Sequence, residues 1–295
     1  MSRSRIIELS RRHFLAGLLP AWLGLQACGC RSAPVTGRKQ LVVVPEGKEL
    51  ALGAEAFQQT LSESKRSENG AAAEIVRRVG QRIADVAQRN EYQWEFALIA
   101  SPEQNAFCLP GGKVAVYEGL LPVCQNEAGL AVVMSHEVAH ALARHGGERM
   151  SQNFAVEGVR QVTDLVTKWK VPDKNAAILR AYGVASNVGF LLPYSRKQEA
   201  EADHIGILMM AQAGYDPAAA PDFWTRFGSA KSGDSTPEFL STHPSDARRA
   251  ENLQKLIPEA GQHYTQDEQK FGAGECLPIY GVYFKCPRAR YGVFN

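Results

Sequence analysis

Apolar residues recur every three or four positions along two stretches of the chain, Leu50–Ser64 and Ala71–Arg89. This spacing places the apolar side chains on one face of a helix and predicts two amphipathic helices. The polar segment Ser64–Gly70 separates them. Two shorter runs rich in β-branched and aromatic residues, Trp94–Ile99 and Lys113–Tyr117, predict strands. We therefore expect two helices followed by a small sheet.

Helical periodicity continues beyond the sheet. One segment begins after Asn126, a typical N-cap residue, and stops at Gly146-Gly147. Another begins at Arg196 and stops before Gly214. Further helices are expected at residues 151–192 with a break at 171–173, at Pro221–Gly228 and at Arg248–Leu256. The whole pattern predicts an α+β fold that is mostly α-helical.

The composition fits one sizeable folded domain. Of the 295 residues, 45% are apolar and 22% are charged, which supplies enough apolar material for one core. The formal net charge is only +2. Nucleic-acid-binding domains usually carry a strongly basic face, so this charge balance indicates that no nucleic acid is a partner.

The first residues resemble an export signal. The stretch Ser10–Leu15 contains the pair Arg11-Arg12 and is similar to a twin-arginine signal, which a receptor recognises. The apolar segment Phe14–Leu25 follows, and it is too short and too interrupted by glycine and proline to span a membrane. The sequence Leu-Gln-Ala-Cys that ends at Cys28 resembles a lipobox, in which the cysteine is lipidated and becomes the mature N-terminus.

These features predict a signal peptide at residues 1–27 and a tether at residues 28–45. A lipid on Cys28 would anchor the protein to a membrane on the periplasmic side of a bacterial cell envelope. The alternatives are a plain cleaved signal and a retained N-terminal anchor.

Five further cysteines would lie in an oxidising compartment. Cys276 and Cys286 can close a small loop, and Cys108 and Cys124 flank a predicted strand and can also pair. Cys30 would then be left over. No pair has C-x-x-C spacing, so we do not expect a zinc site built from cysteines.

The segment His136-Glu137-Val-Ala-His140 reads H-E-x-x-H within the helix that follows Asn126. Four residues are about 400° of helix, so both imidazoles lie on one face, one turn apart. That spacing allows two nitrogens to bind one Zn²⁺ per chain. Glu137 can then act as general base toward a water molecule at the metal. The alternative is two histidines on an ordinary helix.

A catalytic zinc site usually has a third protein ligand. His145 is nine residues, or about 900° of helix, after His136, which predicts that it lies on the opposite face. Glu199 and Asp203 are spaced i, i+4 on a second predicted helix, so one carboxylate can bind the metal while the other orients an imidazole. The alternative is a solvated acidic face.

Three motifs together resemble the HtpX-like and CAAX-prenyl-endopeptidase-like family of zinc metallopeptidases, a gluzincin family. They are His136–His140, Glu199-x-x-x-Asp203 and Thr242-His243-Pro244, and further matching segments are Pro34–Leu41, Asn105-Ala-Phe and Pro110–Val114. The resemblance extends from about Pro34 to about Pro258. The chain is similar in particular to bacterial periplasmic lipoprotein members and mitochondrial Oma-type members.

The resemblance implies that Glu199 is the third metal ligand and that Asp203 hydrogen-bonds a ligand imidazole, which we expect to be His136. Glu201 lies about 200° from Glu199 on a helix, so the two cannot both face the metal, and Glu201→Gln should leave zinc and activity unchanged. Gly206 shares the Glu199 face and permits the close approach of another helix.

The downstream motif supplies two further candidates by the same resemblance. His243 is expected near the metal, where it stabilises the oxyanion or occupies the open site in a resting state. Arg249 stands where the family has its arginine, and Arg248 is the neighbouring alternative.

Gluzincins hold an extended substrate against an edge strand beside the zinc helix. Lys113–Tyr117 is a candidate for this strand, and an internal strand is the alternative. The predicted loop Ser101–Gly112 carries the matching residues Asn105, Ala106 and Phe107, which we assign to substrate binding.

The combined prediction is a zinc endopeptidase in which Glu137 is the general base and the substrates are misfolded or misassembled cell-envelope polypeptides. The metallopeptidase domain is expected at residues 46–260, followed by a C-terminal extension at residues 261–295. One alternative is a non-catalytic envelope chaperone or scaffold that retains the fold. Another is a structural zinc protein in which His243 is a permanent fourth ligand.

Overall fold

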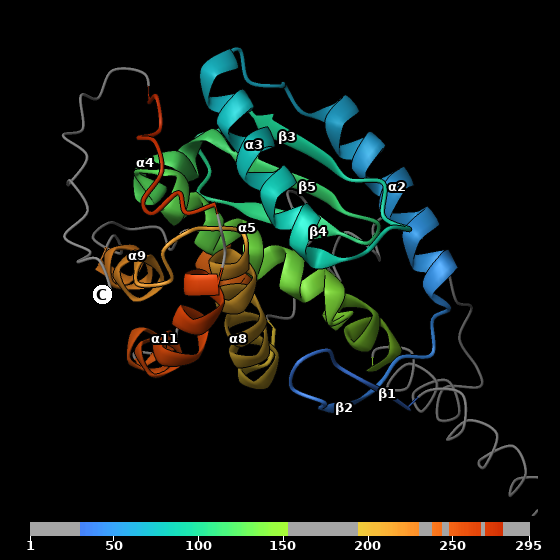
Figure 1. Cartoon of the computed structure of the whole chain (residues 1–295). Helices are drawn as coiled ribbons and strands as arrows, with labels where there is room; N and C mark the ends of the chain where they lie inside the picture. Colours follow the sequence, from blue (N-terminus) through green and yellow to red (C-terminus); the bar gives the residue numbers. More distant parts are fainter. Residues whose placement is uncertain (1–29, 153–193, 230–237, 244–247, 267–268, 280–295) are drawn as a thin grey trace, which may run out of the picture.

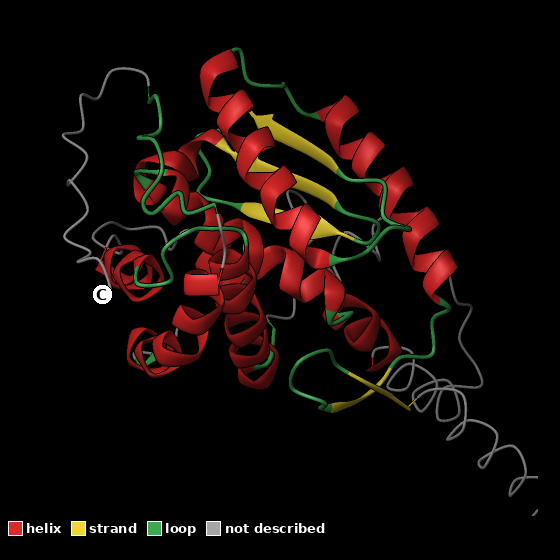
Figure 2. Cartoon of the chain, viewed as in Figure 1, coloured by secondary structure: helices red, strands yellow, loops and turns green. Residues whose placement is uncertain are grey.

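The computed structural model of the chain describes residues 30–152, 194–229, 238–243, 248–266 and 269–279. In these ranges helices predominate, and the strands form one three-stranded sheet and one two-stranded hairpin (Figure 2). The strands are β1 Cys30–Ser32, β2 Lys39–Leu41, β3 Glu95–Ile99, β4 Ala106–Leu109 and β5 Lys113–Tyr117. The helices are α2 Glu46–Glu63, α3 Gly70–Ala87, α4 Leu121–Cys124, α5 Glu127–Leu142, α8 Arg196–Gln212, α9 Ala219–Ser229, α10 Glu238–Thr242 and α11 Arg249–Gln266, with a 3₁₀ turn at Glu118–Leu120.

The three-stranded sheet has the order β3-β5-β4. β5 pairs in parallel with β3 and antiparallel with β4, so the segment that we considered as an edge strand is internal. β3 and β4 are the two edge strands, and β4 forms within the segment 101–112 that the sequence predicted to be a loop. Its four residues are all buried, so they show no alternation of apolar and polar positions. Without that alternation, a segment this short cannot be distinguished from a loop by its sequence.

Both faces of the sheet are covered by helices. Successive residues of a strand point to opposite faces. On β5, Val114 and Val116 pack in the core shared with α3 and α5, whereas Ala115 and Tyr117 pack in a second cluster with Phe57 of α2. Figure 1 shows α2 and α3 alongside the sheet, with α5 and then α8 beyond it.

The two helices predicted to carry the site are confirmed, and both begin at a capping residue. The side chain of Asn126 accepts a hydrogen bond from the backbone N–H of Gly129 at the start of α5. Ser195 and Gln198 form a capping box at the start of α8. α5 ends at Leu142, before the predicted glycine stop, because the chain turns there and Arg144 adopts a φ of 54°.

α5 and α8 pack closely, and a glycine allows it. A Cβ on Gly206 of α8 would lie 3.1 Å from the backbone nitrogen of His136 and 3.2 Å from its Cα. These distances leave little room for a side chain, so Gly206 sets the separation of the two helices where the ligand residues lie. The sequence-based expectation of a close approach at Gly206 is therefore confirmed.

Segments from both ends of the described chain pack against this helical layer. The hairpin β1–β2 lies inside the predicted tether and contacts Glu201 of α8 through Arg38. At the other end, residues 269–279 lie beside the start of α5, where the backbone N–H of Glu127 donates to the carbonyl of Glu275 and Leu277 is buried. α11 extends to Gln266 and therefore crosses the predicted boundary at residue 260.

The cysteines differ in part from the expectation. Cys108 and Cys124 are both buried and free, so they do not pair with each other. Cys276 is disulfide-bonded, and Cys286, the partner expected from the sequence, lies outside the described residues.

The described part of the chain contains no helix that is both long enough and apolar enough to cross a membrane. The predicted signal peptide, Cys28, Pro244 and nearly all of the predicted helical region 151–192 lie outside the described residues.

Candidate metal centre

The zinc-binding motif on α5 brings two imidazoles together as its spacing predicts. The Nε2 atoms of His136 and His140 lie 3.1 Å apart, and both side chains are buried. Burial lowers the pKa of His140 well below its usual value, so its ring is neutral, which is the form that binds a metal ion.

α8 adds a carboxylate to the two imidazoles. Oε1 of Glu199 lies 3.3 Å from Nε2 of His140, and Oε2 lies 3.6 Å from Nε2 of His136. Ligands about 2.0–2.2 Å from a tetrahedral zinc ion are separated from one another by roughly 3.3–3.6 Å. The observed separations therefore fit one zinc ion.

His243 follows α10 and joins the same cluster. Its Nδ1 lies 3.3 Å from Nε2 of His136 and 2.9 Å from Oε1 of Glu199. The ring stacks on Phe239, with centroids 4.5 Å apart. One ligand atom from each of His136, His140, Glu199 and His243 lies within 4.8 Å of all the others. The structure thus brings together four side chains that could hold one metal ion.

The charges of the centre fit a cation. Oε1 of Glu137 and Oε2 of Glu199 are buried and accept no well-aligned hydrogen bond from the described residues; Nε2 of His243 lies 3.4 Å from the first oxygen, and Nη1 of Arg249 lies 3.0 Å from the second. Burial raises the pKa of Glu199, but nearby His243 and Arg249 outweigh it and hold that pKa well below its usual range. Glu199 is therefore a carboxylate, which is the form that binds a metal ion.

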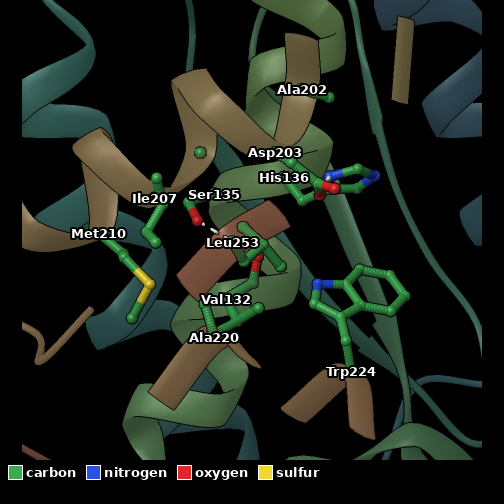
Figure 3. Close-up of a pocket in the computed structure, with 11 residues that line it drawn as sticks. Val132, Ser135, His136, Ala202, Asp203, Ile207, Met210, Ala220, Trp224 and Leu253 are labelled. Atoms are coloured by element: carbon green, nitrogen blue, oxygen red, sulfur yellow. Dashed lines mark hydrogen bonds and ion pairs between the residues drawn. The ribbon is translucent and has the colours of Figure 1, made fainter. Parts of the chain in front are cut away.

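Asp203 and Arg249 both contact the imidazole of His136. Oδ1 of Asp203 is 3.0 Å from Nδ1 of His136, and Figure 3 shows the two side chains meeting beside the indole of Trp224. Arg249 donates to Asp203 from Nε and Nη2 at 2.8 and 2.6 Å, and its Nη1 lies 3.0 Å from Glu199. Arg249 is buried whereas Arg248 is exposed, so Arg249 is the arginine at the site.

His145 also contacts the centre, and the prediction that it lies on the opposite face is wrong. That prediction assumed a continuous helix, but α5 ends at Leu142 and the following turn brings His145 back. Its Nδ1 lies 2.8 Å from Nδ1 of His140, and its Nε2 lies 2.8 Å from Oε2 of Glu201.

The residues assigned to substrate binding lie at and just before the edge strand. Asn105 is buried, and its Oδ1 accepts a hydrogen bond from the backbone N–H of Ala106, the first residue of β4. Its carbonyl accepts from the backbone N–H of Tyr117 on β5. The ring of Phe107 packs against Phe57 on the face of the sheet away from α5. The side chains of Asn105 and Phe107 therefore support β4, and the backbone of β4 forms one edge of the sheet.

Sequence reasoning missed two aromatic residues at the centre. The ring of Tyr194 lies 4.0 Å from that of His140, centroid to centroid, and the guanidinium carbon of Arg249 lies 3.3 Å over the ring of Trp224. Neither aromatic belongs to a spacing pattern with the histidines. Tyr194 directly precedes the Ser195 cap of α8, and that position was the available signal.

Comparisons with known proteins agree with this geometry. The sequence model of peptidase family M48 matches residues 71–257. Mitochondrial metalloendopeptidase OMA1 of Schizosaccharomyces pombe is 37% identical over 235 residues, which cover 77% of this chain and 66% of that protein. The protein of the same name from Saccharomyces cerevisiae is 29% identical over 297 aligned positions, covering 90% of this chain and 80% of that protein.

A bacterial relative is more distant. The beta-barrel assembly-enhancing protease of Escherichia coli K12 is 26% identical over 229 residues, which cover 74% of this chain and 47% of that protein. The chain thus spans between about half and about four fifths of the length of these three relatives.

Proposed function

The chain belongs to peptidase family M48 and carries its zinc metallopeptidase domain, and we propose that it is an endopeptidase acting on misfolded or misassembled proteins of a bacterial cell envelope. The observation that carries this proposal is the convergence of His136, His140 and Glu199 beside a buried second carboxylate, Glu137. A structural zinc site has no use for such a carboxylate, which is costly to bury.

The proposed ligands are His136 and His140 through Nε2, together with Glu199 through its carboxylate. When bound there, Zn²⁺ supplies Lewis-acid chemistry, lowering the pKa of a water molecule and polarising the scissile carbonyl. Asp203 accepts a hydrogen bond from Nδ1–H of His136 and thereby leaves Nε2 as the nitrogen that faces the metal position.

Glu137 is the proposed general base. Burial raises its pKa to about 7, because the charged form loses its hydration. A base whose pKa lies near the working pH accepts a proton well and can also release it. Glu137 would take the proton of the attacking water and deliver it to the leaving amine.

His243 is proposed to act on the substrate side. Its Nε2 lies 3.4 Å from Oε1 of Glu137, so the ring adjoins both the base and the proposed ligands. From that position it can donate a hydrogen bond to the oxyanion that forms at the scissile carbonyl. In a resting state the same ring can fill the fourth position, and it would have to move for a substrate to enter.

An extended substrate is proposed to pair with the backbone of β4. This strand is the edge of the sheet on the side of α5, so a peptide added there would run past the zinc helix. Asn105 supports the strand by its hydrogen bond to Ala106, so we propose an indirect role for it in substrate binding.

The proposed location and substrates rest on the N-terminal sequence. A twin-arginine-like pair at Arg11-Arg12 and a lipobox-like Cys28 favour export and lipid anchoring on the periplasmic side. The E. coli relative is named for enhancing β-barrel assembly, which is an event of the envelope. These points support envelope polypeptides as the substrate class.

The proposal can be tested with an unfolded β-barrel envelope protein and its folded form. We expect the zinc-loaded enzyme to cut the unfolded form at internal bonds, giving fragments that mass spectrometry identifies. A chelator should abolish cleavage, and added Zn²⁺ should restore it. Binding of the unfolded protein without any cleavage would instead support a non-catalytic chaperone.

A further inference from the structure

We propose that His145, Glu201 and Arg38 form a positioning relay that orients the metal ligand His140 and connects it to the N-terminal hairpin. The inference rests on the proposed metal site, since it assigns a supporting structure to one of the ligands. None of these three residues is expected to touch the substrate or the metal.

The first step is the contact between two imidazoles. Nε2 of His140 faces Nε2 of His136 and Oε1 of Glu199, at 3.1 and 3.3 Å, so it is the nitrogen available to a metal. Nδ1 of His140 must then carry the proton. It lies 2.8 Å from Nδ1 of His145, which therefore accepts this hydrogen bond.

The contact between the two imidazoles also sets the tautomer of His145. Because Nδ1 of His145 accepts, the proton of this ring is on Nε2. That nitrogen lies 2.8 Å from Oε2 of Glu201, and both side chains are buried. Glu201 thus fixes the tautomer of His145, and His145 fixes the tautomer and the orientation of His140.

The third step ends the relay on the hairpin. Nε of Arg38 donates to Oε2 of Glu201 at 2.7 Å, and Thr36 also hydrogen-bonds this carboxylate. The two terminal nitrogens of Arg38 donate to Glu148 at 2.9 and 2.8 Å. Gln198 of α8 donates to Glu148 as well, so Arg38 is held from several directions.

The same plan recurs at the other imidazole of the motif. His136 contacts Asp203, and Asp203 accepts from Arg249. His140 reaches Glu201 through His145, and Glu201 accepts from Arg38. Each metal-facing imidazole is therefore connected to a carboxylate of α8 that accepts a hydrogen bond from an arginine. The arrangement at His140 contains one more imidazole, that of His145, and its arginine, Arg38, comes from a segment distant in the sequence.

Hairpin geometry keeps Arg38 in place. The backbone N–H of Ala33 donates to the carbonyl of Arg38 at 2.8 Å, and that of Gly37 donates to the carbonyl of Ala33 at 3.1 Å. Gly37 adopts a φ of 66°, which suits glycine at this turn. A segment that the sequence predicted to be a tether thus contributes to the metal centre.

The test measures zinc affinity by competition with a chromophoric chelator, using the full-length protein and the variants His145→Ala, Glu201→Gln and Arg38→Gln. Outer hydrogen-bond partners of metal ligands typically contribute about 10–100-fold in affinity. We expect each variant to lose affinity within that range, with Arg38→Gln at the lower end. The absorption bands of the Co²⁺-substituted protein should shift in the same variants, because the orientation of His140 changes.

A matched control separates the relay from a general loss of stability. Glu127, the first residue of α5, is also a buried carboxylate. It forms ion pairs with Arg78 and Arg82 and accepts a hydrogen bond from the hydroxyl of Tyr215. Glu127→Gln should lower the free energy of unfolding while leaving zinc affinity and the Co²⁺ bands unchanged.

The double variant His145→Ala/Glu201→Gln gives the sharpest outcome. If the two residues act through one chain of hydrogen bonds, the double variant loses no more affinity than His145→Ala alone. Additive losses, or wild-type affinity and spectra in folded single variants, would overturn the relay. If His145→Ala does not fold, Arg38→Gln decides the question, since its side chain lies nearer the surface. If the variants lose zinc affinity as expected but the zinc-loaded wild-type protein shows no peptidase activity, the relay stands and the proposed function is rejected.

Discussion

At the scale of single residues, two buried carboxylates in one site have different environments and therefore different proposed roles. Burial raises the pKa of Glu137 to about 7, whereas His243 and Arg249 overcome the effect of burial at Glu199 and keep its pKa well below the usual range. Separated pKa values of this kind distinguish a residue that exchanges protons from one that stays charged. The first suits a general base, and the second suits a metal ligand.

His243→Ala tests whether the fourth member of the cluster serves the reaction or the metal. We expect turnover to fall by about 10²–10³, the usual effect of losing an oxyanion contact, while zinc affinity falls far less. The comparison is with Glu199→Gln, which should lose zinc. Both are followed by zinc titration and peptide hydrolysis. If His243→Ala loses zinc as completely as Glu199→Gln, the centre is a four-ligand structural site.

The residues of the site were predictable where a motif fixes them, and His145 shows where such prediction stops. Its distance in sequence from His136 places it on the far side of an ideal helix, yet α5 ends at Leu142. Arg144 adopts a positive φ, which few residues other than glycine do, and no local pattern announces it. The same turn changes the expectation for Glu201→Gln, because Glu201 now reaches a proposed ligand through His145.

At the scale of elements, the centre depends on the crossing of α5 and α8. Small residues on both helices allow their backbones to approach, and Gly206 lies directly against the backbone of His136. In Figure 3, side chains of both helices, among them Val132 and Met210, line a small cavity behind His136. The separation of the helices therefore determines whether Glu199 can reach the position between the two histidines.

Gly206→Val tests this crossing. The Cβ of the valine would lie 3.1 Å from the backbone nitrogen of His136 and 3.2 Å from its Cα, so the helices must separate. We expect the free energy of unfolding to fall by about 1–3 kcal/mol, as in other overpacked cores, and zinc affinity to fall with it.

The matched control is Gly261→Val on α11. Apart from Gly261, its chain neighbours and the backbone of its own helix, no atom of the described residues lies within 4 Å of a Cβ built there, so this variant should change neither quantity appreciably. Denaturant unfolding and zinc titration of both variants give the comparison. Wild-type zinc affinity in Gly206→Val would show that the crossing does not position Glu199.

Long periodic elements could be predicted from the sequence, and short buried ones could not. The predicted helix Ala71–Arg89 corresponds to α3, Gly70–Ala87, because its apolar spacing continues for five turns. β4 has only four residues, and pairing with β5 rather than its own pattern makes it a strand. Strand order likewise depends on long-range contacts, so β5 was a plausible edge from the sequence and is internal in the fold.

At the scale of the whole molecule, segments far apart in the chain meet around α5 and α8. The β1–β2 hairpin contacts Glu201 at one side, and residues 269–279 pair with the start of α5 at another. Glu127 in that first turn pairs with Arg78 and Arg82 of α3. The catalytic helix is therefore fixed by elements from before and after it in the sequence.

Cys28→Ser tests the proposed anchoring of this assembly. We expect the wild-type protein to incorporate labelled fatty acid and to fractionate with membranes. The variant should incorporate none and should fractionate with the soluble periplasmic proteins, because a serine has no thiol to which a lipid can be joined by a thioether bond. Arg11→Lys together with Arg12→Lys should block export altogether. Membrane fractionation and labelling that are unchanged in Cys28→Ser would exclude a lipid on this residue.

The central claim is that one zinc ion held by His136, His140 and Glu199 works with Glu137 to hydrolyse peptide bonds. The most direct measurement is the rate of hydrolysis of an unfolded polypeptide by wild type and Glu137→Gln, each with its zinc content determined in the same sample. We predict one zinc ion per chain in both proteins and a loss of turnover of at least about 10²-fold in the variant, the contribution of a positioned general base. Wild-type turnover in a zinc-loaded Glu137→Gln protein, or loss of its zinc, would contradict the account.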